Sequence, residues 1–445
     1  MEDKSNSNSK TQRMALDKIP SLVMRFSLTT FAALFFNALY NLVDSLFVSR
    51  GVGDNAMGGV SIVFAFMIIQ AAIAQTVGGG AAVLVSRFLG QKEENKAGQV
   101  TLNAMAVFYI SALLVSLLGF IFMKPILSFL GATEEVFPYA RQYFLIILAG
   151  NVFSTGFSSI IRAEGQMTYA LLIWLLPTAV NIVFDAVFIF GFKWGVAGAA
   201  LATVLCQFVS FLMSVLFFLK FSRQEFKRAR LSLKTVKEIF SLGLPTLVQM
   251  SSLSVLIMFL NKTISSVGGT PAINTFAYVS KIIIFATVPF NAVSQAMSPV
   301  IAFNYGAKNF ERVKKTLNFS IIICLIYALA AMVISQFISP YFIQVFTKNS
   351  QLILSGAQAI RITALALPFA PISIIFGTYF QARGRKIQAF MLNFSILAFM
   401  LPITLVFTKL WSVEGVWWSF LPACLLAALL SLAVKKATDR RELIL

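Results

Sequence analysis

The stretch VSRFLGQKEENKA, residues 85–97, has a related copy later in the chain, IAFNYGAKNFERV, residues 301–313. Gly90 of the first copy aligns with Gly306 of the second, 216 residues further along. In each copy the glycine lets the chain turn after a helix, and the basic residues that follow favour a cytoplasmic loop. The pair indicates that the chain is built from two related halves.

The composition requires lipid as the solvent for most of the protein surface. The chain is 58% hydrophobic, has a mean hydropathy of +0.83 and is only 12% charged, whereas a water-soluble domain carries about a quarter charged residues. Runs of about 20 apolar residues predict about twelve membrane-spanning helices, because the runs are too long and too uniform for the strands of a membrane barrel. The predicted spans are 24–48, 57–85, 100–122, 139–161, 168–190, 196–219, 239–264, 273–300, 317–340, 355–379, 388–408 and 413–434.

Further motif pairs extend the repeat over both halves of the chain. They are SLTT with GLPT (27–30 and 243–246), EGQ with RGR (164–166 and 383–385), and WGVAGAALA with WSVEGVWWS (194–202 and 411–419). Each half then holds six helices, so both halves enter the membrane from the same side and form a parallel repeat. We predict an all-α polytopic membrane protein with two six-helix lobes. Its expected divisions are a tail 1–19, an N-terminal lobe 20–220, a basic linker 221–238, a C-terminal lobe 239–434 and a tail 435–445.

The positive charge predicts the orientation of the chain in the membrane. The formal net charge is +19, and most basic residues fall in the two termini and the even-numbered loops, with the densest cluster in the linker KFSRQEFKRARLSLKTVK (220–237). Basic loops stay on the cytoplasmic side. We therefore expect cytoplasmic termini and no nucleic-acid binding.

Two acidic residues lie well inside predicted spans, Asp44 in the first and Asp185 in the fifth. A carboxylate at bilayer depth costs several kcal/mol, so it is protonated, paired or bound to a cation. The alternative is a structural hydrogen bond to a neighbouring helix. At the repeat-related positions the second half has Leu260 and Pro402, so the shared architecture does not need the acids, and a functional role is favoured.

Amide and hydroxyl groups accompany both acids on the same helix faces. Asn181 lies four residues before Asp185, and Asp44 is preceded at helical spacing by Asn37, Tyr40 and Asn41. Carboxylate and amide oxygens suit a proton or Na⁺. The sequence therefore predicts a cation site that links the first and fifth helices.

Other polar and sulfur-containing side chains are candidates for a substrate cavity. They are Gln70, Asn151, Gln249, Met250, Asn291 and Met297, and each one singly is also explained by a bond between helices or by ordinary packing. Lys281, in the eighth span, either lies in a central cavity or extends toward the interface.

Several kinds of chemistry have no support in the sequence. The chain has no histidine, and its three cysteines fall in apolar helices, which indicates packing rather than disulfides or a metal site. The glycines of VGGGAA (77–82) lie inside an apolar helix and lack the ending of a nucleotide-binding loop. No ATPase motif is present, so we expect an ion gradient to supply the energy and no cofactor to be needed.

The sequence resembles the multidrug and toxic compound extrusion (MATE) family of transporters over about residues 20–435. The resemblance rests on the order and spacing of YNLVDSLFV (40–48), SRFLGQ (86–91), RAEGQ (162–166), NIVFD (181–185) and WGVAGAALAT (194–203). It is to the bacterial branch whose cation-site acids lie in the N-terminal lobe.

The resemblance implies a twelve-helix antiporter that alternates access by a rocker-switch movement of two lobes. It also implies a cation site, for H⁺ or Na⁺, at Asp44, Asn181, Asp185 and Thr203. The sequence departs from the family near the start of the first helix, where Thr29 replaces a proline that the second lobe keeps as Pro245. This departure puts in doubt the bending of the first helix that is proposed for the family.

We therefore expect a cell-membrane exporter of amphipathic, mainly cationic small molecules, which acts without an obligate protein partner and can work as a monomer. One alternative is a lipid-linked saccharide flippase of the same superfamily, which would need a strongly cationic groove. Another is a membrane-embedded transferase, which the lack of histidine and the short loops disfavour, so we do not expect an enzyme. A channel is a third, weakly disfavoured by the absence of a filter motif.

Overall fold

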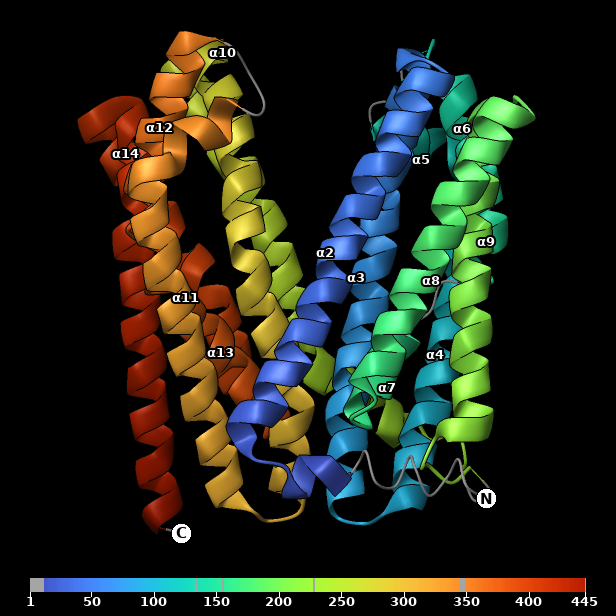
Figure 1. Ribbon diagram of the computed structural model, residues 1–445, viewed down its shortest axis with the longest axis vertical. Coiled ribbons are helices and arrows are strands. Elements are labelled where there is room, and N and C mark those ends of the chain that lie inside the picture. Colours follow the sequence, from blue (N-terminus) through green and yellow to red (C-terminus); the bar gives the residue numbers. More distant parts are fainter. Residues whose placement is uncertain are drawn as a thin grey trace. The chain divides into compact units, whose positions relative to one another are not determined.

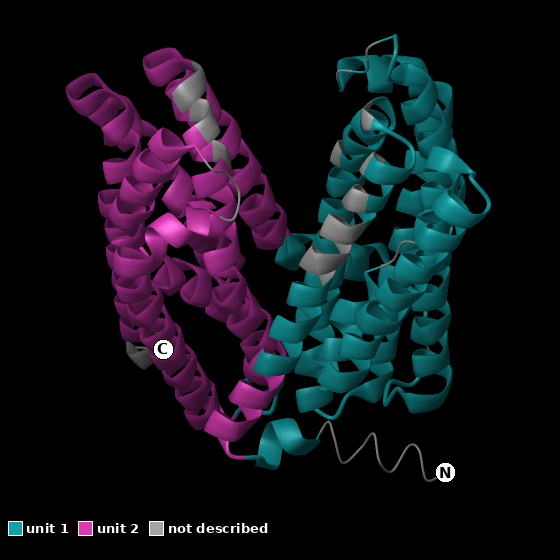
Figure 2. Ribbon diagram, turned by 45° about the horizontal axis from the view of Figure 1, so that its top comes forward, with its two compact units in different colours: residues 1–17, 28–243, 302–308 teal, residues 18–27, 244–301, 309–445 magenta. Residues whose placement is uncertain are grey.

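The computed structural model describes residues 12–130, 132, 134–153, 156–226, 229–344 and 349–444, and within these ranges the chain is helical without strands. The helices fall into two compact units, shown separately coloured in Figure 2. Unit 1 comprises Met1–Asp17, Leu28–Gly243 and Ala302–Lys308, and unit 2 comprises Lys18–Ser27, Leu244–Ile301 and Asn309–Leu445. Two helices therefore cross the unit boundary along their length.

Unit 1 is a bundle formed by the first half of the chain (Figure 1). Its elements are α2 (Ile19–Gly51), α3 (Asp54–Gly90), α4 (Glu94–Ile121), α5 (Met123–Phe129), α6 (Phe137–Gly150), the 3₁₀ helix η1 (Asn151–Phe153), α7 (Phe157–Ala163), α8 (Met167–Asp185), the π-helix η2 (Ala186–Gly191), α9 (Gly195–Leu216) and the π-helix η3 (Phe217–Phe221). Glycines let these helices approach closely. A Cβ on Gly150 would lie 2.3 Å from the Val204 side chain, so α6 and α9 are in direct contact.

Unit 2 is formed mostly by the second half of the chain. Its elements are α10 (Leu233–Gly306), α11 (Phe310–Gln344), α12 (Ser350–Ala364), α13 (Ala370–Ala382) and α14 (Lys386–Ile444). Its apolar core includes Phe276 of α10, stacked on Trp417 of α14 at 6.0 Å between ring centroids. Both long helices hold two spans, because α10 is kinked at Gly269 and α14 at Trp411 and Ser412.

The predicted spans agree with this architecture. Ten helical stretches in the described part of the chain are long and apolar enough to cross a membrane. One of these ten stretches, α14, holds two predicted spans. The tenth predicted span is not among the ten stretches, because it is divided between the shorter helices α12 and α13. With these two additions all twelve predicted spans are accounted for. The fourth span is broken in the corresponding place, between α6 and α7. Both halves thus interrupt the same helix of the repeat.

Both ends of α10 pack closely on α3 within unit 1. A Cβ on Gly80 of α3 would lie 2.0 Å from the Ile239 carbonyl oxygen, and one on Gly90 would lie 2.0 Å from that of Phe303. Residue types larger than glycine do not fit at such crossings without moving the backbone. The repeated glycine at position 90, which the sequence analysis assigned to a turn, therefore also permits a close helix contact.

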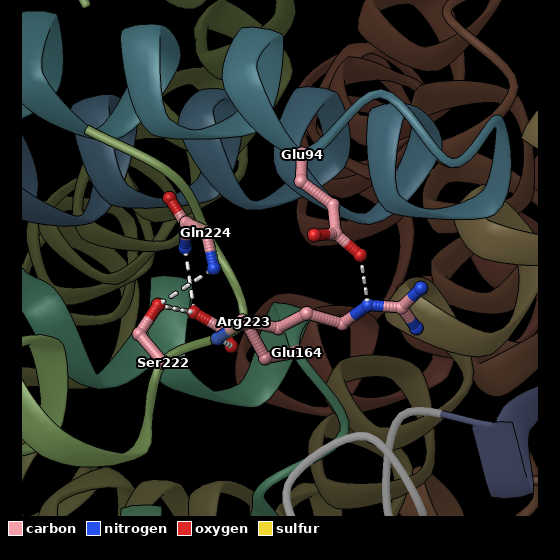
Figure 3. A network of polar contacts seen from close by, with 5 residues as sticks. All are labelled: Glu94, Glu164, Ser222, Arg223 and Gln224. Atoms are coloured by element: carbon pink, nitrogen blue, oxygen red, sulfur yellow. Dashed lines mark hydrogen bonds and ion pairs between the residues drawn. The ribbon is translucent and has the colours of Figure 1, made fainter. Parts of the chain in front are cut away.

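The basic linker is bound to unit 1 by a buried hydrogen-bond network, which we call the linker clasp (Glu94, Glu164, Ser222, Arg223 and Gln224). The Glu164 carboxylate accepts from Ser222 Oγ at 2.6 Å, from the Arg223 backbone N–H at 2.9 Å and from Gln224 Nε2 at 2.7 Å (Figure 3). The Arg223 guanidinium also forms an ion pair with Glu94 (Figure 3). Burial raises the pKa of the Glu164 carboxyl, and the hydrogen bonds to its donors act against that rise.

Candidate functional site

Two carboxyl groups from different helices meet inside unit 1. Asp44 of α2 and Asp185, the last residue of α8, lie within hydrogen-bonding distance of one another. Asp185 is fully buried, and Asp44 is 9% exposed. The two acids that the sequence singled out, 141 positions apart in the numbering, therefore belong to one site.

Amide and hydroxyl groups surround this carboxyl pair. Oriented so that both of its ends find partners, the Asn181 amide donates to Asp185 Oδ2 at 2.9 Å and accepts from the Thr203 backbone N–H at 3.3 Å. Asn181 is fully buried, and Thr203 is 3% exposed. Asn181 thus ties α8 to α9 and orients one oxygen of Asp185.

Three buried oxygens at the site have no hydrogen-bond partner among the described residues. They are Asp44 Oδ1, Asp185 Oδ1 and Thr203 Oγ1. A buried acceptor that lacks a donor costs roughly 1–3 kcal/mol, and more when it is charged. Two carboxylates in contact in an apolar interior also repel unless a proton or a cation lies between them. These carboxylate and hydroxyl oxygens are therefore suited to binding a proton or a small hard cation.

The structure adds two residues that the sequence analysis did not single out. Tyr143 of α6, 3% exposed, lies close to the Thr203 hydroxyl and to both carboxyl groups. Cys206 of α9, one turn after Thr203, also lies within electrostatic range of both carboxyl groups. A tyrosine inside an apolar span usually has a polar partner for its hydroxyl, and that rule could have drawn attention to Tyr143.

The helix that carries Asp185 departs from regular α geometry at the site. Pro177 lies inside α8 and removes one backbone hydrogen bond, and the π-helix η2 begins directly after Asp185. Single π turns inside helices are frequent at functional sites. The rings of Phe188 and Trp194, 5.0 Å apart and stacked, hold the turn that leads into α9.

The remaining residues of the predicted cavity are dispersed over both units. Asn37, Tyr40 and Asn41 lie outside the residues whose side chains the structure describes. Asn151 is buried and donates to the Ala112 carbonyl oxygen at 3.0 Å, so it holds η1 against α4. Four of the other residues are half-buried: Gln70, Gln249, Met250 and Asn291. Met297 is fully buried. The cavity assignment remains a prediction.

Comparison with known proteins places this geometry in a family. The model of the MatE family matches residues 30–187 and 245–406, one segment in each half of the chain. The chain belongs to the MatE family. It is therefore a multi-pass membrane protein of a transporter family, and each matched segment covers the first five predicted spans of one half of the chain.

MatE relatives and structures resemble this chain over nearly its whole length. The multidrug export protein MepA of Staphylococcus haemolyticus is 22% identical over 418 residues, which cover 93% of this chain and 92% of the relative. MepA of Staphylococcus aureus MSSA476 is 24% identical over 417 residues, which cover 92% of this chain and 92% of the relative. Among solved structures, an outward-facing multidrug resistance MATE transporter has a TM-score of 0.86 at 24% identity, and a MATE protein in the straight conformation has a TM-score of 0.89 at 23% identity. Each match covers 96% of this chain and 97% of the other, so the MATE fold is shown.

Proposed function

We propose that this protein is a secondary active multidrug efflux transporter of the cell membrane. It exchanges amphipathic, mainly cationic molecules for H⁺ or Na⁺, and the carboxyl pair of Asp44 and Asp185 binds the coupling ion. The names of the MepA relatives, which are multidrug export proteins, support the export of drugs. The meeting of the two intramembrane carboxyl groups is the observation that carries the assignment of the ion site.

The coupling ion would act by joining α2 to α8 and α9. With an ion or proton between them, the two carboxyl groups attract a common positive charge, and Asn181 and Thr203 add oxygen ligands. Without it, two carboxylates at this separation repel each other. The position of α2 is then set by the occupancy of the site.

Coupling requires the ion to prefer one of the two access states. We propose that the ion enters from outside and stabilises the state in which α2 is held against α8. Substrate release outward then precedes return to the inward-open state. Because α2 is one continuous helix through Thr29, we expect it to move as a whole rather than to bend at the position of the missing proline.

Export from vesicles tests the function. Purified protein is reconstituted, ethidium is supplied on the cytoplasmic face, and a pH gradient or a Na⁺ gradient is imposed separately. Ethidium export under one gradient supports the proposal and identifies the coupling ion. Absence of export under both gradients would contradict it and would direct attention to lipid-linked saccharides as the cargo.

A further inference from the structure

The basic linker presents two leucines on the surface of unit 1. Leu231 and Leu233 are 69% and 81% exposed. Ser232, which lies between them, has an extended backbone with φ −144° and ψ 117°. Because side chains two positions apart along extended backbone point to the same side, the two leucines form one apolar face.

The backbone that carries this face is fixed to α4 by a single buried side chain. Asn103 is fully buried. Its Nδ2 donates to the Arg230 carbonyl oxygen at 2.9 Å, and its Oδ1 accepts from the Ser232 backbone N–H at 2.7 Å. Leu231 lies between these two hydrogen bonds, so an ordered backbone holds its side chain outward.

The apolar face lies at the level where the membrane begins. Asn103 is three positions inside the apolar run predicted from residue 100, and Leu233 begins α10, six positions before the run predicted from residue 239. The two helices therefore place the leucines in the interfacial layer, which adds roughly 5–8 Å to each side of the hydrocarbon core. Acyl chains are the favourable surroundings for leucine side chains at this level.

Positive charge accompanies the apolar face. Arg230, Lys234 and Lys237 are exposed, and the sequence between Glu225 and Glu238 has five basic residues and no acidic one. A polybasic cluster directly before a membrane helix attracts anionic lipids. A soluble phosphate would bind the charges but would leave both leucines in water, so the combination favours a lipid.

We propose that residues 229–237 bind anionic phospholipids of the leaflet that the positive charge predicts to be cytoplasmic. Leu231 and Leu233 lie between the acyl chains, while the Arg230, Lys234 and Lys237 side chains extend to the lipid phosphates. Asn103 is a positioning residue, because it holds the backbone on both sides of Leu231. This lipid site goes beyond the proposed transport function and does not depend on it.

The test measures which lipid lies next to residue 231. The Leu231→Cys variant of the full chain is labelled with a nitrobenzoxadiazole fluorophore and reconstituted in bilayers of phosphatidylcholine and phosphatidylglycerol. Spin-labelled acyl chains on one lipid or the other quench the fluorophore, and the two quenching curves give the relative affinity of the lipids. Wild-type protein treated with the same fluorophore gives the background, because the native cysteines are buried or half-buried.

We expect phosphatidylglycerol to be preferred at least fivefold at this label, since one basic residue near the surface contributes about a fivefold change in affinity. Combining Arg230→Gln, Lys234→Gln and Lys237→Gln should bring the ratio of affinities close to one. Combining Arg230→Lys, Lys234→Arg and Lys237→Arg should retain the preference, because the charges are kept.

Two controls separate this site from general attraction to a basic protein. Phe129, at the end of α5, is 90% exposed and is followed in the sequence by Glu134 and Glu135. A fluorophore on Phe129→Cys should report no preference for phosphatidylglycerol. Replacing three exposed basic residues of unit 2 by glutamine should leave the preference at residue 231 unchanged; they are Lys314, Lys436 and Arg440.

Four results would overturn the inference. One is a preference that survives neutralisation of Arg230, Lys234 and Lys237, and another is an equal preference at Phe129. A third is a fluorophore at residue 231 that aqueous iodide quenches and lipid chains do not. The fourth is loss of the preference in excess inorganic phosphate at constant ionic strength, which would identify a soluble phosphate as the ligand.

Discussion

At the scale of single residues, the carboxyl pair depends on neutral groups that hold its oxygens in place. Asn181 orients Asp185 through one amide hydrogen bond, while Tyr143 supplies a hydroxyl close to Thr203 and to both carboxyl groups. These groups add no charge to unit 1. They therefore affect how strongly the site binds its ion, whereas the two carboxyl groups determine whether the site binds an ion at all.

Replacing Tyr143 by phenylalanine removes the hydroxyl and keeps the ring. We expect the ion concentration for half-maximal export to rise about fivefold, because a hydroxyl next to the carboxyl groups that can hydrogen-bond within the ion-loaded site contributes about 1 kcal/mol. The measurement is ethidium export at a series of ion concentrations. Tyr109→Phe is the control, since the Tyr109 ring packs on Phe157, outside the carboxyl site; equal values for both variants would show that Tyr143 has no part in the site.

The sequence identified Asp44 and Asp185 because a charge inside an apolar run is conspicuous and costly. Their face partner Asn181 followed from helical spacing, and Thr203 followed from the family resemblance. The rule that a tyrosine in an apolar span needs a polar partner applies to Tyr143 and equally to the other tyrosines of the spans. Only the packing of α6 against α9 brings Tyr143 to the site, and the sequence does not show that packing.

At the scale of elements, the linker clasp makes residues 222–226 a fixed part of unit 1. Replacing Glu164 by alanine leaves three donors without their acceptor, at a cost of roughly 1–3 kcal/mol each. We expect trypsin to cleave after Arg223 several times faster in Glu164→Ala than in wild-type protein, assayed on vesicles with the cytoplasmic face outward. Glu311→Ala removes an exposed carboxylate paired with Lys315 and serves as control; equal cleavage in both variants would contradict the clasp.

The glycine crossing between α3 and α10 predicts a stability effect. In Gly80→Ala the new methyl group would lie 2.0 Å from the Ile239 carbonyl oxygen, so the two helices must move apart. We expect a loss of about 1–3 kcal/mol in stability, as for other overpacked sites, measured as a lower thermal unfolding midpoint in detergent. Gly191→Ala, where a Cβ meets nothing within 4 Å, should leave the midpoint unchanged. Identical midpoints for the two variants would show that the crossing is not tightly packed.

Hydropathy predicted that the spans exist, but it did not predict where their helices are interrupted or depart from α geometry. The breaks after α6 and after α12 escaped prediction because apolar composition reports length and not backbone hydrogen bonding. The π-helices η2 and η3 escaped for the same reason. In contrast, the motif pairs placed the repeat correctly, because they reflect corresponding turns in both halves.

At the scale of the whole molecule, the distribution of basic residues predicts which loops face the cytoplasm. A cysteine introduced at Asn309, between α10 and α11, should react with an impermeant maleimide only when the cytoplasmic face is accessible. A cysteine introduced at Glu134, between α5 and α6, should react only from the opposite face. The native cysteines are buried or half-buried, so their background labelling should be low; the reverse pattern would invert the predicted orientation.

The central claim is that Asp44 and Asp185 together bind the coupling ion, and Asp185→Asn tests it most directly. The measurement is gradient-driven ethidium export from reconstituted vesicles, with Asp439→Asn as a control because Asp439 pairs with Lys435 at the far end of α14. The account predicts that Asp185→Asn loses export under the gradient that drives the wild-type protein, while Asp439→Asn retains it. Gradient-driven export that persists at the wild-type rate in Asp185→Asn would contradict the account.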